Sequence, residues 1–220
     1  GSITIPSSVD GRPVVGINHR ALADQTGLIS VKVPSSVVFM GGSVFQGCKN
    51  LEEVVLPDGL AMFQSSWFNG CSQIERLTLP GNLAELTPAI FDIPELKHLV
   101  IGSGTQDVMP GAFAKSQLES ITVSQDNPFM KTDGTAIYSA EGRIMACLAM
   151  PVESYEVAEG CQVLGRKCFS NMASVQRVYL PESLEIVGPF AMANTSIKSF
   201  IAPDGLLSVE EKAFFNCEAL

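Results

Sequence analysis

A short pattern recurs along this chain: an apolar residue, any residue, a second apolar residue and then proline. Its prolines at positions 34, 57 and 80 are separated by 23 residues each time. A fixed period of this length is typical of repeat architectures and constrains the fold more than any other feature. The complete copies are Ile3-Thr4-Ile5-Pro6, Val31-Lys32-Val33-Pro34, Val54-Val55-Leu56-Pro57, Leu77-Thr78-Leu79-Pro80 and Val178-Tyr179-Leu180-Pro181. Weaker copies without the proline in phase begin at Leu99, Ile121 and Tyr155, and a last one, Ser199-Phe200-Ile201-Ala202-Pro203, is interpreted as slipped by one position.

A second landmark has the same period. A small or apolar residue precedes an aromatic or long apolar one, and the second members at 22, 45, 68 and 91 are again 23 residues apart. Two landmarks that keep phase over most of the chain predict that each repeat is one structural unit. The pairs are Ala21-Leu22, Val44-Phe45, Trp67-Phe68, Ile90-Phe91, Ala112-Phe113, Cys168-Phe169, Ala191-Met192 and Ala213-Phe214.

These landmarks predict how each unit folds. The alternating apolar residues of the tetrad indicate a short strand, and proline ends it because proline has no N–H to donate to a ladder. The chain then returns on the far side, where the aromatic residue packs beneath that of the previous unit. Because one unit cannot bury its apolar face alone, the units must stack. We expect a β-rich repeat solenoid, a right-handed superhelix with a parallel stacked sheet, short helical or irregular return segments and about eight rungs spaced by roughly 4.8 Å.

The clearest unit, from Leu51 to Cys71, reads L-x-x-V-x-L-P-x-x-L, then seven residues, then F-x-x-C. It resembles the BspA-like leucine-rich repeat of bacterial and some protist surface proteins, and the resemblance covers essentially the whole chain. The copies near Gly102 and Ser124 depart from it because they lack the proline. The resemblance implies a leucine-rich-repeat fold, display at a cell surface or secretion, and attachment to host proteins or to other cells.

One stretch breaks the period. Between Ser124 and Ala158 the step is 34 residues, and two apolar runs flank Ala140-Glu141-Gly142, which suggests a β-hairpin. It resembles the hairpin insert that BspA-like arrays carry in place of a return segment. We therefore expect residues 1–220 to form a single solenoid with a hairpin-like insert at about 124–157. We also expect it to be a fragment of a longer array, because it begins directly in a strand and stops where the next should open.

Composition limits the class of partner. The 220 residues are 46% hydrophobic and only 17% charged, which is sufficient for a continuous core, and the net charge is −9. An acidic chain repels phosphate backbones and anionic lipids, so we expect neither nucleic acid nor a membrane surface as partner. No apolar run approaches the roughly 20 residues of a membrane span, and this segment shows no signal peptide.

Cysteines recur at one repeat position. Cys48, Cys71 and Cys217 each lie three residues after the second landmark, and Cys168 takes the small position before Phe169. This recurrence predicts a ladder of small buried residues, with Cys48 and Cys71 reduced in neighbouring rungs. A disulfide, a reactive thiol and a metal ligand are the alternatives, but no C-x-x-C pair of a zinc site is present.

The sequence predicts no catalytic residue, cofactor site or metal site. Its two histidines, His19 and His98, fall several rungs apart, and no cysteine shares the outward strand positions with His98. Glu52 and Glu53 are neighbours in a strand and point to opposite faces, so they are not the paired carboxylates of a glycosidase. Asn194-Thr195-Ser196 fits the acceptor pattern for N-glycosylation.

Two functions remain in competition: a non-enzymatic protein-binding or adhesion module, and a structural spacer in a larger surface protein. A binding face should carry aromatic, arginine or apolar residues on the outward strand positions, and a spacer should carry small polar ones there. We expect Arg76 and His98 to be neighbours with Val100 beside them, and Arg177, Tyr179 and Ile201 to form a second cluster. The partner expected from the resemblance is a host or other cell-surface protein. The predicted partner-binding residues are Arg76, His98, Val100, Arg177, Tyr179 and Ile201.

Overall fold

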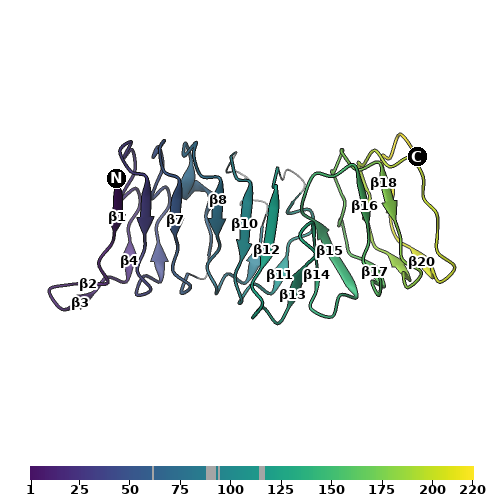
Figure 1. Cartoon of the computed structure of the whole chain (residues 1–220), viewed down its shortest axis with the longest axis horizontal. Coiled ribbons are helices and arrows are strands. Elements are labelled where there is room, and N and C mark those ends of the chain that lie inside the picture. The colour runs from purple at the N-terminus through teal and green to yellow at the C-terminus, as the bar shows by residue number, and fades with distance from the viewer. Residues whose placement is uncertain (61, 88–92, 94, 114–116) are drawn as a thin grey trace. The chain divides into compact units, whose positions relative to one another are not determined.

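A computed structural model of the chain describes residues 1–60, 62–87, 93, 95–113 and 117–220, which form two compact units. The first unit consists of Gly1–Gln106 and Glu119–Asn127, and the second of Asp107–Leu118 and Pro128–Leu220. Within each unit short parallel strands stack on one another, which confirms the predicted solenoid of stacked strands (Figure 1). A single solenoid over residues 1–220 stays a prediction.

The tetrads of the first unit lie on strands, which we call front strands. They make two parallel sheets, β1-β5-β7 and β8-β10-β12. The first residue of each tetrad points to the inside: Val31 pairs with Val54, and Leu77 with Leu99, and all four are at most 4% exposed. The front strands are β1 Ser2–Thr4, β5 Ser30–Lys32, β7 Glu53–Val55, β8 Arg76–Thr78, β10 His98–Ile101 and β12 Ser120–Val123.

The return segments of the first unit contain short strands, which we call back strands. The sequence predicted short helical or irregular segments at these positions. Ile17, Met40 and Leu86 are buried there and stand one or two periods apart, a third landmark with the same spacing. These elements are β4 Gly16–Ile17, β6 Phe39–Met40, β9 Glu85–Leu86, the antiparallel β2 Ser8–Val9 and β3 Arg12–Pro13, and η1 Ser65–Phe68. Among the described residues η1 is the only helix. It is too short to cross a membrane, so the described residues contain no helix that could do so.

The second unit has fewer front strands and a larger back sheet. Its front strands β16 Ser154–Glu156 and β18 Arg177–Tyr179 form a parallel pair. The back sheet has the order β13-β14-β15-β17-β19-β20, in which the first three strands are antiparallel and the rest are parallel. These strands are β13 Met130–Thr132, β14 Ala136–Ser139, β15 Ile144–Leu148, β17 Val163–Leu164, β19 Ile186–Val187 and β20 Ser208–Val209, and β11 Asp107–Val108 also belongs to this unit.

The last tetrad differs from its expected form in two ways. Residues 199–203 form no strand. The N–H of Lys198 donates to the carbonyl oxygen of Gln176 at 3.0 Å, in the same way that Gln176 donates to Glu153 at 2.8 Å one rung earlier. Phe200 therefore follows Val178 in phase after 22 residues, and the interpretation of this copy as slipped by one position is wrong.

The aromatic landmark residues form the centre of each unit. Phe45 and Phe68 in the first unit, and Phe113 and Phe169 in the second, are at most 1% exposed. The rings of Phe45 and Phe68 are stacked with centroids 5.7 Å apart and an interplanar angle of 17°. An offset stack of this kind adds to the burial of both rings and fixes the spacing of successive returns. The landmark Ile90-Phe91 lies outside the described residues.

The landmarks at positions 22, 45, 169, 192 and 214 are each flanked by two residues with positive φ, two positions before and two positions after the landmark. In the first unit Asp24 and Gly47 occupy the later position with φ of 61° and 75°. A Cβ on Gly47 would also meet the carboxylate of Asp24, so a larger residue there would displace that exposed side chain. In the second unit asparagine, which tolerates this conformation better than most residues, takes the position at Asn171, Asn194 and Asn216.

Candidate functional site

The outward residues of β8 and β10 lie as neighbours on the face of the first unit. Arg76 is opposite His98 and Thr78 is opposite Val100 in the parallel ladder. Arg76 is exposed, whereas His98 and Val100 are half-buried. The structure thus brings together the three residues predicted for this region, on strands that run side by side in Figure 1.

His98 is hydrogen-bonded to a serine of the next rung, a contact that the sequence reading did not single out. Its Nδ1 lies 2.8 Å from Oγ of Ser120, which is its register partner on β12. A nucleophilic serine needs a base oriented by a third group and donors for an oxyanion. In the part of the chain that the structure describes, no carboxylate is hydrogen-bonded to His98. The contact links β10 to β12.

The second predicted cluster surrounds a hollow in the second unit. Arg177 and Tyr179 on β18 and Ile201 on the next rung line an opening of about 260 Å³. Tyr179 is 56% exposed and Ile201 is 83% exposed. The remaining lining residues are Val178, Leu180, Glu182, Ser199, Ala202 and Pro203.

The charged groups at this hollow are only loosely held. Arg177 lies 3.8 Å from a carboxylate oxygen of Glu153, and both side chains are more than half exposed. An exposed ion pair at this distance contributes little free energy, so the guanidinium is free to form a better pair with a partner. Arginine and tyrosine side chains dominate the binding energy of many protein interfaces, and here they stand on one rigid strand.

A buried polar cluster in the second unit joins the β14–β15 hairpin to the front strand β16. Tyr138 on β14 and Tyr155 on β16 have hydroxyl oxygens 2.6 Å apart. Tyr155 also donates to Oδ2 of Asp133, and the N–H of Ala158 donates to the Tyr138 hydroxyl at 3.1 Å. Burial raises the pKa of both phenols above the ordinary value. The cluster therefore holds β16 against the hairpin with neutral tyrosines.

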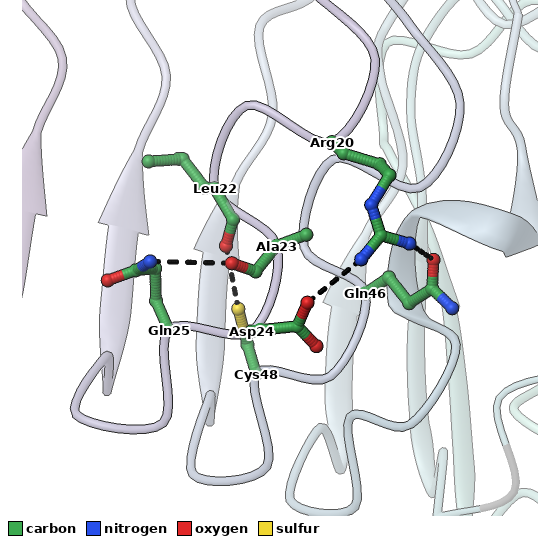
Figure 2. A network of polar contacts seen from close by, with 7 residues as sticks. All are labelled: Arg20, Leu22, Ala23, Asp24, Gln25, Gln46 and Cys48. Carbon is green, nitrogen blue, oxygen red and sulfur yellow. Dashed lines mark hydrogen bonds and ion pairs between the residues drawn. The ribbon is translucent and has the colours of Figure 1, made fainter.

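The return side of the first unit carries an exposed polar network that the sequence reading missed. Figure 2 shows Arg20 donating from Nη1 to Oε1 of Gln46 at 2.6 Å and from Nη2 to Oδ2 of Asp24 at 2.8 Å. The N–H of Asp24 donates to the carbonyl of Gln46 at 2.7 Å, so the network joins successive returns. Arg20 and Asp24 are the two positive-φ residues that flank the first landmark. Their positions relative to the landmark are part of the repeat pattern.

The cysteines are free and all but one are buried. Cys48 donates its thiol proton to the carbonyl oxygen of Leu22 at 3.1 Å, beside the network of Figure 2. Burial raises the pKa of Cys48, and raises that of Cys71 from 9.0 to about 12. Such thiols are poor nucleophiles near neutral pH. Among the described residues no group of three or more histidine, cysteine or acidic side chains is placed to hold a metal ion.

The comparisons with known proteins agree with this geometry. Residues 16–134 and 145–220 match, in six copies, the sequence profile of the family described as "BspA type Leucine rich repeat region". No match to a curated protein was found.

Solved structures of bacterial leucine-rich repeat proteins share the fold. One from Bacteroides ovatus is 19% identical with a TM-score of 0.56, and the alignment covers 100% of this chain and 62% of that one. One from Eubacterium ventriosum is 14% identical with a TM-score of 0.55, covering 97% of this chain and 82% of that one. This chain therefore spans less than two thirds of the length of the Bacteroides ovatus protein.

Proposed function

Because the chain belongs to the BspA-type leucine-rich repeat family, whose members are generally non-enzymatic, we propose that it is a protein-binding module. In this proposal it is displayed at a cell surface or secreted, and it attaches to a protein of a host or of another cell. The contact is made by the outward face of the second unit around Arg177, Tyr179 and Ile201.

The observation that carries this proposal is the exposure of Tyr179 and Ile201 around one hollow. Burying an apolar side chain that is otherwise in water contributes about 1.5–3 kcal/mol, so two such side chains make a strong anchor. Arg177 beside them supplies hydrogen-bond donors, and β18 fixes Arg177 and Tyr179 in place before a partner arrives. Rigid residues lose little conformational entropy on binding.

A smaller contribution comes from the face of the first unit. Arg76, His98 and Val100 form a continuous patch there, but His98 is already hydrogen-bonded to Ser120 and half-buried. We therefore place the energetic centre of the contact in the second unit.

The alternative function, a spacer in a larger surface protein, is favoured by one observation. The first outward position of the front strand is serine in five repeats, and Oγ of Ser30 donates to Oγ of Ser2 at 2.6 Å. Small polar residues of this kind satisfy one another across rungs and offer little to a partner. The spacer proposal requires that changes at Tyr179 and Arg177 have no effect on attachment.

The experiment measures attachment of the fluorescently labelled chain to intact cells, before and after protease treatment of the cell surface. Attachment that is lost after the treatment identifies a protein partner. Tyr179→Ala and Arg177→Ala should each weaken it by more than about 1 kcal/mol, as expected for anchor residues. The matched control is Arg143→Ala, an exposed arginine of the same unit outside the hollow. Unchanged attachment by both folded variants would support the spacer and overturn the proposal.

A further inference from the structure

The return side of the second unit carries cationic side chains gathered around one aromatic ring. Cζ of Arg166 lies 6.0 Å from the centroid of the Phe190 ring, and Nζ of Lys212 lies 5.8 Å from it. An aromatic ring attracts cations at this distance, so Phe190 favours both positions. Lys167 follows Arg166 directly in the chain and is half-buried. We call Arg166, Lys167, Phe190 and Lys212 the basic cluster.

The repeat brings these residues together from distant parts of the sequence. Lys167, Phe190 and Lys212 each stand two positions before a landmark and have φ of 58°, 56° and 51°. The N–H of Lys167 donates to the carbonyl of Pro189 at 3.1 Å, and the N–H of Phe190 donates to that of Glu211 at 3.0 Å. The backbone thus fixes three successive returns side by side, with the cluster along them.

The same repeat position in the first unit holds a cation that is already neutralised. Arg20 is paired with Asp24, four residues later, at 2.8 Å (Figure 2). In the second unit the position four residues later holds an amide, which carries no charge to neutralise a cation. These residues are Asn171, Asn194 and Asn216.

The cations of the cluster have little internal compensation. Lys212 lies 3.8 Å from a carboxylate oxygen of Glu211, and the two side chains are 56% and 72% exposed, so this pair contributes little free energy. In the described part of the chain Arg166 and Lys167 form no ion pair. The cluster is therefore a local surplus of positive charge on a chain whose net charge is −9.

An exposed aromatic side chain adjoins the cluster. Phe215 is 52% exposed, and its ring meets that of Phe190 edge-on, with centroids 6.4 Å apart and an interplanar angle of 65°. The surface therefore offers cations and an apolar ring beside one another. Burying the exposed part of Phe215 under an apolar group would be favourable.

The acidic remainder of the chain limits what can occupy this surface. At physiological ionic strength exposed charges more than about 8 Å apart are largely screened, so a short anion experiences the local charge rather than the net charge. A long polyanion, such as a nucleic acid or an anionic membrane surface, would extend over the acidic remainder and be repelled. A short segment with carboxylates and an apolar side chain matches both the cations and Phe215.

We propose that the basic cluster and Phe215 bind a short acidic peptide segment of a partner protein. Carboxylates of the segment pair with Arg166, Lys167 and Lys212, and an apolar side chain covers Phe215. None of these residues lines the hollow at Tyr179, so this second contact surface does not depend on the proposed function.

The first test uses a fluorescein-labelled peptide in which two glutamates flank a phenylalanine on each side. Fluorescence anisotropy at physiological ionic strength should show saturable binding that weakens as salt is added. The same peptide with glutamine in place of glutamate keeps its size but lacks the charges, and it should bind about tenfold more weakly or worse. No saturable binding of the acidic peptide up to about 1 mM, or equal binding of the two peptides, would overturn the proposal.

The second test removes single charges from the chain. Arg166→Gln and Lys212→Gln should each weaken binding of the acidic peptide by about fivefold, with circular dichroism and the melting temperature unchanged. The matched control is Arg143→Gln, at an exposed arginine of the same unit outside the cluster, which should bind as the wild type does. An equal loss for all three variants would mean that only the net charge matters and would contradict the proposal.

The third test adds the counter-ion that the first unit has. In Asn171→Asp the new carboxylate stands four residues after Lys167, and it can still accept the bond that Nδ2 of Asn194 donates to residue 171 at 2.8 Å. This variant should remain folded and bind the acidic peptide about fivefold more weakly. Undiminished binding would show that Lys167 does not contact the peptide and would count against the cluster.

The fourth test examines the apolar contact. Phe215→Ala should weaken binding of the phenylalanine peptide but should have no effect on a peptide with alanine in its place, because the two side chains then have no shared contact to lose. An equal loss with both peptides would contradict the proposed placement of the apolar side chain.

Other occupants give different results. Tyr179→Ala should bind the acidic peptide as the wild type does, and a loss there would move the peptide to the front face and overturn the proposal. Binding of heparin or of phosphatidylserine vesicles that depends on Lys212, without binding of the peptide, would assign the cluster to a polyanion instead. Self-association that Lys212→Gln abolishes, again without peptide binding, would assign it to a second copy of this chain.

Discussion

The thiol of Cys71 donates a hydrogen bond to the carbonyl oxygen of Phe45, at 3.1 Å, across two successive repeats. Cys48 makes the same contact with Leu22 at 3.1 Å, and Cys217 with Met192 at 3.0 Å. In each case the cysteine three residues after one landmark bonds to the landmark residue of the preceding repeat. The cysteine ladder is therefore more than a row of small residues, because it satisfies backbone carbonyls at the turn of each return.

Replacing Cys71 by alanine should lower the free energy of unfolding by about 1–3 kcal/mol. The change leaves a small cavity at a position that is 1% exposed, and it removes one of the two hydrogen bonds to the Phe45 carbonyl, which keeps the bond from the N–H of Cys48 at 3.1 Å. Urea unfolding followed by circular dichroism measures the loss, and Gln73→Ala, at an exposed neighbouring position, should stay within about 0.5 kcal/mol of the wild type. A Cys71→Ala variant as stable as its control would show that the bond contributes nothing.

All six cysteines should be counted as free thiols. In the structure each is free, and the parallel side chains of Cys48 and Cys71 do not favour the right-angled torsion of a disulfide. Thiol counting on denatured, unreduced protein measures the number. A count below six would show that at least one pair is oxidised in solution.

Alkaline pH should destabilise the chain partly through Cys71. Burial raises its pKa from 9.0 to about 12, so the unfolded state loses this proton first as the pH rises. The contribution is fully present below about pH 9 and is lost progressively between pH 9 and about 12. Urea unfolding at pH 8, 9 and 10 should show a shallower decline for Cys71→Ala than for the wild type. Parallel declines would mean that the thiol does not couple to folding.

The sequence predicted the fold well because the repeat period reports stacking directly. The tetrads from Ile3 to Val178 all lie on strands, and the described landmark phenylalanines before residue 200 are buried. Single residues within the pattern were harder to interpret. The last copy, Ser199-Phe200-Ile201-Ala202-Pro203, was interpreted as slipped by one position, whereas it keeps the phase of the other tetrads and forms no strand.

The division of the front strands between β7 and β8 was likewise not predicted. Trp67 stands there at a landmark position that holds Val44 in the preceding repeat. The indole is 1% exposed, and its Nε1–H has no hydrogen-bond partner in the described part of the chain. The hydrophobic pattern predicts neither the break between β7 and β8 nor the indole N–H without a partner among the described residues. The contact between His98 and Ser120 follows from the period, because the two residues are register partners on neighbouring strands.

Tyr155→Phe should destabilise the second unit by about 1–3 kcal/mol. The variant keeps the ring but removes the hydroxyl that bonds both Tyr138 and Asp133 in a buried cluster, leaving partners unsatisfied. Tyr179→Phe is the matched control, because that tyrosine is 56% exposed and should lose almost nothing. Thermal unfolding compares the two variants. Similar melting temperatures for both would show that the buried cluster does not hold the hairpin.

Asn194 is the middle residue of an asparagine ladder, a row of hydrogen-bonded side chains along the positive-φ turns of the second unit. Its Nδ2 donates to Oδ1 of Asn171 at 2.8 Å, and its Oδ1 accepts from Nδ2 of Asn216 at 3.1 Å. Its φ is 58°, a conformation that costs an alanine roughly 1–2 kcal/mol and a glycine almost nothing.

Two substitutions at Asn194 separate the hydrogen bonds from the backbone conformation. Asn194→Gly removes both side-chain bonds but keeps the turn accessible, so its free energy of unfolding should fall by about 1 kcal/mol. Asn194→Ala removes the same bonds and strains the backbone, so it should fall by about 1 kcal/mol more than the glycine variant. Urea unfolding of the two proteins gives the difference. If Asn194→Ala were as stable as Asn194→Gly, residue 194 would not adopt the left-handed conformation in solution. That result would contradict the conformational reason given for asparagine at this turn.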